Sequence, residues 1–306
     1  MRRRPMAWLL LGAFALSRSV PAGAAGKLNV VTTLSTFADL VKTIGGEHVE
    51  VSSVASPKFN PHFIEPKPSD VLRVKRADLF AHGGLDLELW RGPLLDAAGN
   101  REVMPGGPRE LDLSRGIGLL EVPDHPVSRA EGDIHLYGNP HYWVDPDNAR
   151  IMAQHICEKL SEIDPPHAPE YRRNLEGFLQ RLDAKIAGWR QRLAPYQGQE
   201  LVCYHNEWPY LMRFAGLRMT RFLEPKPGIP PTPKQLEVIE QYIKEQRLRG
   251  IVQATYFPEQ AADTIAKRTG AKVILLCQNV REVPDASDYL ATVEYNVKQL
   301  TQGLQP

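Results

Sequence analysis

Residues 27–55, KLNVVTTLSTFADLVKTIGGEHVEVSSVA, decide the fold class because the apolar pattern changes period twice within them. A short apolar run at residues 27–33 is followed by apolar residues at helical spacing, and these end on the pair Gly45-Gly46. A second strand pattern follows at residues 49–55. A strand, a helix and another strand in this order predict a parallel α/β sheet.

The same alternation continues on both sides of a long interruption. Ser69 and Asp70 can cap a further helix, and a strand is expected at residues 78–84. Residues 97–140 are richer in Gly, Pro and charge, so we expect a peripheral ribbon and loop there. The alternation resumes near residue 200. Further strands are expected at residues 200–205, 218–224, 250–256 and 272–277, with helices between and after them.

A long helix is predicted between these two regions. A first helix begins at Asp145, and residues 165–196 then carry apolar residues three and four apart, which predicts one helix of about 28 residues and about 40 Å. We therefore predict an N-terminal α/β lobe over residues 25–162, a linking helix over 163–196 and a C-terminal α/β lobe over 197–306. A cleft is expected between the lobes.

The first 24 residues have the pattern of a secretory signal peptide. A basic segment precedes an apolar run from Met6 to Leu16, and small residues at 22–24 predict cleavage near Ala24. No later segment reaches about 18 uninterrupted apolar residues. We expect an exported, soluble, periplasmic protein that is a monomer.

The charge balance gives no reason to expect a nucleic-acid or anionic-lipid partner. The formal net charge is +1, and four of the arginines lie in the predicted signal peptide, which has no acidic residue. The mature chain is therefore slightly acidic. Three cysteines, Cys157, Cys203 and Cys277, are too few for a disulfide scaffold, and an odd number leaves at least one thiol outside any intramolecular pair.

Three histidines lie where a metal site is expected. His62 follows the second strand, His141 precedes the inter-lobe helices, and His205 ends the first strand of the second lobe. Ligands of open α/β sheets bind beyond the carboxyl ends of the strands. Neutral imidazole is a good zinc ligand, and three histidines form a plausible ligand set for zinc.

Three motifs in the same order resemble the zinc- and manganese-binding receptors of bacterial ABC importers. The resemblance is carried by NPHFIEPKPSDV (60–71), GNPHYWVDPDNA (138–149) and YHNEWPYLMRFAGL (204–217), and it extends over most of the mature chain. It implies two four-stranded α/β lobes bridged by a rigid helix, with metal in the cleft. It also implies that His62, His141 and His205 bind the metal.

The resemblance implies a receptor that captures metal and delivers it to a membrane permease, with a periplasmic metallochaperone as a further candidate partner. We expect zinc ahead of manganese or copper, because manganese prefers more carboxylate oxygen than three imidazoles provide. Ligation needs neutral imidazole, so binding should weaken as the pH falls toward about 6.

The chain departs from the family pattern around the fourth ligand. The usual aspartate before the second Pro-His is Asn139, Cys277 stands where a ligand carboxylate is usual, and Thr255 replaces another carboxylate. The fourth position is open to the Cys277 thiolate, a water, His135 or nothing. Glu65, three residues after His62, is a candidate to orient that imidazole.

Two other functions fit three histidines on this fold. A zinc hydrolase also uses three protein ligands and a water. The chain has no H-E-x-x-H helix, and Glu65 and Glu207 are the general-base candidates, so we expect that it is not an enzyme. A surface adhesin or a metallochaperone would use the same fold without a permease.

Overall fold

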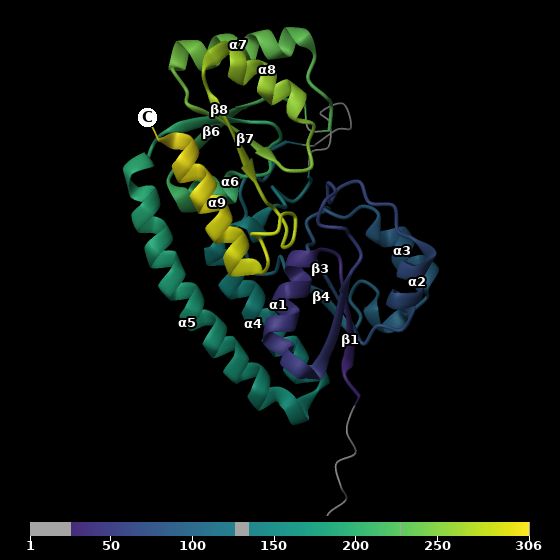
Figure 1. The fold of residues 1–306 in the computed structure, drawn as a ribbon. Coiled ribbons are helices and arrows are strands. Elements are labelled where there is room, and N and C mark those ends of the chain that lie inside the picture. The colour runs from purple at the N-terminus through teal and green to yellow at the C-terminus, as the bar shows by residue number, and fades with distance from the viewer. Residues whose placement is uncertain (1–25, 126–134, 227, 306) are drawn as a thin grey trace, which may run out of the picture.

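Two lobes, each built on a four-stranded parallel sheet, make up the computed structural model, which describes residues 26–125, 135–226 and 228–305 (Figure 1). The N-terminal sheet has the order β2-β1-β3-β4, and the C-terminal sheet has the order β6-β5-β7-β8. The strands are β1 (Leu28–Thr32), β2 (Val49–Ser53), β3 (Leu79–His82), β4 (Glu110–Asp112), β5 (Glu200–Cys203), β6 (Arg218–Phe222), β7 (Gly250–Ala254) and β8 (Lys272–Leu276). The predicted fold class is confirmed. The predicted signal peptide lies outside the described residues.

Helices cover both faces of each sheet, as the near-continuous apolar strands require. Consecutive strand residues point to opposite faces, and Val30 and Val31 of β1 accordingly pack into two different apolar clusters. The helices are α1 (Ser35–Gly45), α2 (Pro68–Lys75), α3 (Arg91–Ala98), α4 (Pro146–Ile163), α5 (Ala168–Leu193), α6 (Pro209–Ala215), α7 (Pro233–Gln246), α8 (Glu259–Thr269) and α9 (Tyr289–Leu304). Among the described residues, none of these helices is long and apolar enough to cross a membrane.

The long helix α5 contacts both lobes. Near its start, the Asn174 amide donates a hydrogen bond to the carbonyl of Ile44 in α1 (2.9 Å). Near its end, the buried Trp189 indole donates to the Glu294 carboxylate in α9 (2.9 Å). The helix has 26 residues, and one-turn 3₁₀ segments that contain proline flank it on both sides. Figure 1 shows α5 running along the side of both lobes, as a bridging helix should.

One apolar core is continuous through both lobes. It includes Phe37 of α1, Trp143 beside α4, and Tyr289 of α9. Hydrogen bonds cross the same boundary: the Trp143 indole donates to the carbonyl of Gln278 (2.9 Å), and the Ser35 hydroxyl donates to that of Val280 (2.8 Å). The relative position of the two lobes is therefore held by packing as well as by α5.

The prediction of a peripheral ribbon and loop at residues 97–140 was wrong in part. Strand β4 completes the N-terminal sheet, where it pairs in parallel with β3. A strand of three residues is too short to show a period of its own, so it could not be recognised from the apolar pattern.

Candidate metal centre

His62 is positioned by the loop between β2 and α2. The side-chain oxygen of Asn60 accepts a hydrogen bond from the His62 backbone N–H (3.0 Å), and the Trp90 indole donates to the carbonyl of Pro61 (2.8 Å). The imidazole itself is hydrogen-bonded to the backbone of Leu87. Its Nε2 atom faces His141.

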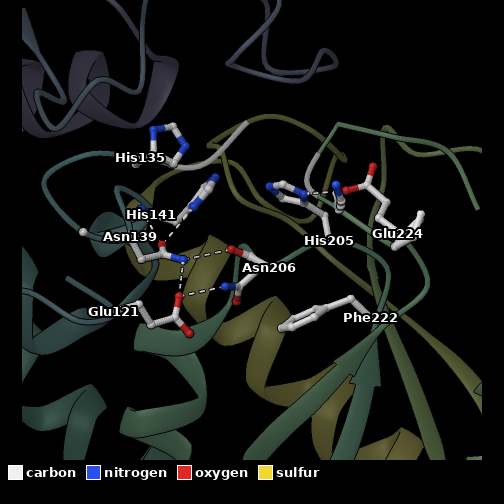
Figure 2. A pocket seen from close by; sticks show the side chains of 11 residues that line it. Glu121, His135, Asn139, His141, His205, Asn206, Phe222 and Glu224 are labelled. Carbon is white, nitrogen blue, oxygen red and sulfur yellow. Dashed lines mark hydrogen bonds and ion pairs between the residues drawn. The ribbon is translucent and has the colours of Figure 1, made fainter. Parts of the chain in front are cut away.

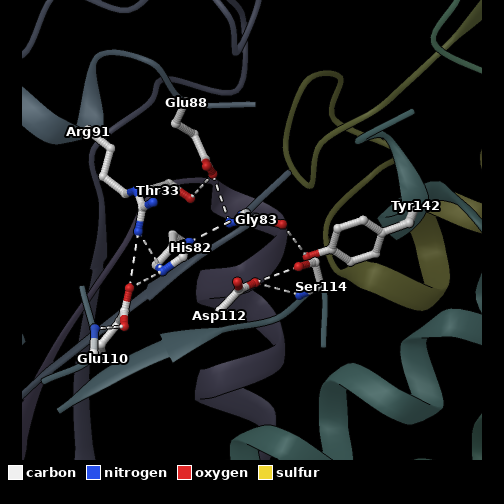
Figure 3. Close-up of polar contacts among 11 residues, drawn as sticks. Thr33, His82, Gly83, Glu88, Arg91, Glu110, Asp112, Ser114 and Tyr142 are labelled. Carbon is white, nitrogen blue, oxygen red and sulfur yellow. Dashed lines mark hydrogen bonds and ion pairs between the residues drawn. The ribbon is translucent and has the colours of Figure 1, made fainter. Parts of the chain in front are cut away.

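The loop after β3 contains Leu87, which is bonded to His62, and a buried polar network stabilises this loop (Figure 3). The Glu88 carboxylate accepts from the Thr33 hydroxyl (2.6 Å) and from the Gly83 backbone N–H (2.8 Å). Gly84 has φ +66°, and a Cβ there would lie 2.4 Å from a carboxylate oxygen of Asp112, so the turn requires glycine. His82 belongs to this network, with Nε2 2.9 Å from the Glu110 carboxylate, and it is not among the converging histidines.

His141 has its tautomer set by Asn139. The Asn139 side-chain oxygen accepts from the His141 backbone N–H (3.1 Å) and lies 3.0 Å from Nδ1 of the ring. The amide nitrogen of Asn139 donates to the Glu121 carboxylate (3.0 Å) and to the carbonyl of Asn206 (2.9 Å), which fixes the oxygen toward the ring (Figure 2). Nδ1 therefore carries the proton and Nε2 presents its lone pair. An amide oxygen here does what the usual aspartate would do.

His205 has the same arrangement with a carboxylate. Its Nδ1 lies 2.7 Å from the Glu224 carboxylate, and both side chains are buried. The Gly228 backbone N–H donates to the same Glu224 oxygen (3.2 Å). A carboxylate behind an imidazole orients the ring and increases its basicity as a ligand, so the Nε2 atom of His205 is directed to the cavity.

The three predicted histidines come together. Ligand atoms of His62, His141 and His205 all lie within 4.8 Å of one another, and the Nε2 atoms of His62 and His141 are 3.0 Å apart. Ring nitrogens around a tetrahedral zinc at 2.0–2.1 Å would be about 3.3 Å apart. The cavity beside them, of about 310 Å³, is lined by His141 and His205 among others. Three imidazole nitrogens this close together could hold a metal ion.

Burial keeps the imidazoles of His62 and His141 neutral. The pKa values of His62 and His141 lie well below the usual value of 6.5, first because burial disfavours the charged ring and second because other imidazoles are close. A neutral imidazole can bind metal without first losing a proton. The depressed pKa values move the expected loss of binding in acid to a lower pH than the unperturbed value suggests.

Cys277 is not brought to the three histidines. Its side chain is fully buried at the end of β8, and its backbone N–H and carbonyl are both hydrogen-bonded to the Asn296 amide of α9 (2.8 and 2.7 Å). Burial, and then the nearby Glu282, raise the pKa of the thiol, which disfavours the thiolate that a metal needs. All three cysteines are buried and free.

Glu65 does not orient His62. Its side chain is exposed and lines a groove on the outside of the N-terminal lobe. Other residues position the remaining two imidazoles. Asn139 and Glu121 support His141, and Glu224 supports His205; they lie two to twenty residues from the histidine in sequence. Trp143 packs against His141 with ring centroids 5.4 Å apart, as expected.

Comparisons with known proteins agree on one family. The family model described as "ZnuA: Zinc-uptake complex component A periplasmic" matches residues 30–303. The iron-binding protein YfeA of Yersinia pestis is 25% identical over 299 residues, which cover 96% of this chain and 92% of that protein. The manganese ABC transporter substrate-binding lipoprotein ScaA of Streptococcus gordonii is 24% identical over 98% of this chain and 96% of its own length.

A solved structure shares the fold over nearly the whole chain. The crystal structure of a ZnuA deletion mutant with zinc bound has a TM-score of 0.76 and 25% identity, and the match covers 92% of this chain and all of that one. The names of these similar proteins include iron, manganese and zinc. The donor atoms of this site therefore decide which metal it favours.

Proposed function

Because the chain belongs to the ZnuA family of periplasmic metal-binding components of ABC importers, we propose that its cargo is zinc and that it delivers zinc to a membrane permease. The observation that carries this proposal is the convergence of three buried imidazoles, His62, His141 and His205, whose Nε2 atoms face one point. We propose these three residues as ligands.

The donor atoms favour zinc. Imidazole nitrogen suits zinc, whereas manganese prefers a site with more carboxylate and water oxygen. Two carboxylates, Glu224 and Glu121, belong to the hydrogen-bond network around the site. Glu224 accepts from His205 and Glu121 accepts from the Asn139 amide, so neither is available as a ligand. The donors that face the cation are therefore nitrogen atoms.

The imidazoles are already arranged to capture the ion. All three rings are buried, those of His62 and His141 have lowered pKa values, and Asn139 and Glu224 already orient His141 and His205, so little ordering is needed when the ion enters. The continuous core and α5 limit lobe motion, so we propose that small movements of the ligand loops complete the site. Docking on the permease would then release the ion, and the receptor would act as a monomer.

The same geometry supports a binding protein and not a hydrolase. Glu207, one candidate base, is fully buried, and one of its carboxylate oxygens accepts from Tyr256 (2.8 Å) and Gln278 (2.7 Å). Glu65, the other candidate, is exposed outside the cavity. We propose that neither activates a metal-bound water.

A competition titration with a zinc chelator tests the proposal. The wild-type protein should bind one zinc per chain, and His141→Ala should lose more than about a hundredfold in affinity, since it removes a ligand and its orienting bond. His125→Ala is the matched control, because His125 is an exposed histidine outside the cluster. If His141→Ala bound zinc as tightly as wild type, the ligand assignment would be wrong.

A further inference from the structure

A fourth histidine lies at the mouth of the cavity. His135 lines it together with His141 and His205, and Figure 2 shows its ring beside His141. The ring centroid of His135 is 5.0 Å from that of His62 and 6.2 Å from that of His141. Four imidazoles from three loops therefore gather around one space, because His135 and His141 lie in the same segment before Tyr142.

These spacings are close to those of a tetrahedral site. With metal–nitrogen distances of 2.0–2.1 Å, the ring centroids of four coordinated imidazoles would lie roughly 5 Å apart. Among His62, His141 and His205 the three centroid distances are 5.0, 5.8 and 5.7 Å. The 5.0 Å from His135 to His62 already fits. The 6.2 Å to His141 is about 1 Å longer than such a site has, and the nitrogens of His135 lie outside the 4.8 Å group, so the His135 ring must move inward to coordinate.

The other candidate donors around the cavity are engaged elsewhere. Glu224 and Glu121 hold His205 and the Asn139 amide. Glu282 accepts from the Thr255 hydroxyl and from two backbone N–H groups. One oxygen of Glu207 accepts from Tyr256 and Gln278, and its other oxygen is buried without a hydrogen-bond partner, but Glu207 does not line the cavity. Cys277 is held against α9. Of the described side chains with metal-binding atoms, His135 is the one at the cavity mouth that a small movement brings to the cation.

We propose that His135 is the fourth ligand and completes an all-imidazole site that discriminates zinc from manganese. This inference rests on the proposed function, because it assigns a further residue to the same cation. A fourth nitrogen in place of the family's usual carboxylate removes the oxygen donor that manganese prefers. His135 thus determines specificity as well as coordination number.

Cobalt substitution combined with zinc and manganese titrations tests the assignment. We expect His135→Ala to weaken zinc binding by about tenfold to a hundredfold and to change the visible absorption of the cobalt-loaded protein, since water would replace an imidazole. His135→Asp should keep four protein ligands. It should lower the ratio of zinc affinity to manganese affinity by about tenfold to a hundredfold. His125→Ala, in the same stretch of chain, should match wild type in both measurements.

Each outcome separates this inference from the proposed function. If His135→Ala kept the wild-type zinc affinity and cobalt spectrum while His141→Ala lost binding, the receptor would stand and the fourth-ligand assignment would fail. A slower association rate alone, with unchanged affinity, would also overturn it and make His135 an entry residue. A thiolate-to-cobalt charge-transfer band that disappears in Cys277→Ser would assign the position to Cys277. Thermal melting of the metal-free variants checks that each one folds.

Discussion

The Asp39 carboxylate in α1 accepts a hydrogen bond from the backbone N–H of Tyr289, the first residue of α9, at 2.9 Å. The first helix of the N-terminal lobe therefore binds the start of the last helix of the C-terminal lobe. Burial raises the pKa of Asp39 from 3.8 to about 6; the Tyr289 bond and Arg281 oppose this rise, and Asp288 adds to it. At neutral pH this contact holds a charge in a mostly buried place.

Asp39→Asn should therefore stabilise the metal-free protein at neutral pH. Because the folded-state pKa is above the unfolded value, the folded protein binds more protons, and wild-type stability falls as the pH rises from about 4 to 6. An amide still accepts from Tyr289 but is never ionised, so the variant should gain on the order of 2 kcal/mol at pH 7 and nothing below pH 4. Urea unfolding of both proteins from pH 3.5 to 7.5 measures the difference. A gain that is the same at every pH would contradict this origin.

Asn139→Ala should weaken zinc binding by about tenfold to a hundredfold, because the Nδ1 proton of His141 would lose its acceptor and the ring its orientation. Asn139→Asp keeps an acceptor for Nδ1 but sets a carboxylate oxygen against the Glu121 carboxylate and the Asn206 carbonyl, so it should restore binding only in part. Chelator competition provides the affinities. If alanine and aspartate were equally harmful, the role of Asn139 would lie in the loop backbone and not in the tautomer.

Glu224→Ala should also lower the zinc affinity by about tenfold to a hundredfold, since His205 would lose the carboxylate behind Nδ1. Glu224→Gln keeps an acceptor oxygen without the charge and should have a smaller effect. Glu245→Gln, on the exposed side of α7, is the matched control. If the three variants had the same zinc affinity, Glu224 would not contribute to binding through His205.

Zinc affinity should be nearly independent of pH between about 8 and 6.5 and should fall below that range. The pKa values of the free His62 and His141 rings lie well below 6.5, so protons compete with zinc only in more acidic solution. The affinity should then decrease by roughly tenfold per pH unit for each proton displaced. Titrations with a chelator of known proton affinity measure this profile. A decline that starts near pH 7.5 would show that the rings are not desolvated.

The sequence was sufficient for most of the fold because seven of the eight strands are long enough to show their pattern, and helices of clear amphipathic period separate them. Strand β4 was missed because its three residues show no apolar pattern of their own, and only their pairing with β3 identifies them as a strand. The three converging histidines were predictable because each has a characteristic neighbour, such as Pro61 or Pro140, in a loop at a sheet edge.

The supports of these histidines were not predictable in the same way. Glu224 is nineteen residues from His205, and the strand β6 that brings it there sets the distance. At the end of β8, the sequence could not tell which of several consecutive residues faces the cleft; Cys277 is fully buried there, and its backbone is hydrogen-bonded to Asn296 of α9. Which side chain points where at a strand end depends on twist and register, and these are tertiary properties.

The continuous core has a consequence for how the chain acquires its structure. Synthesis proceeds from the N-terminus, so α1 and α5 emerge before α9, whose Tyr289 and Val293 cover them in the shared core. Until the last sixteen residues of helix are available, the Trp189 face of α5 has no partner for its indole. The two halves should therefore fold cooperatively, and only after α9 has emerged.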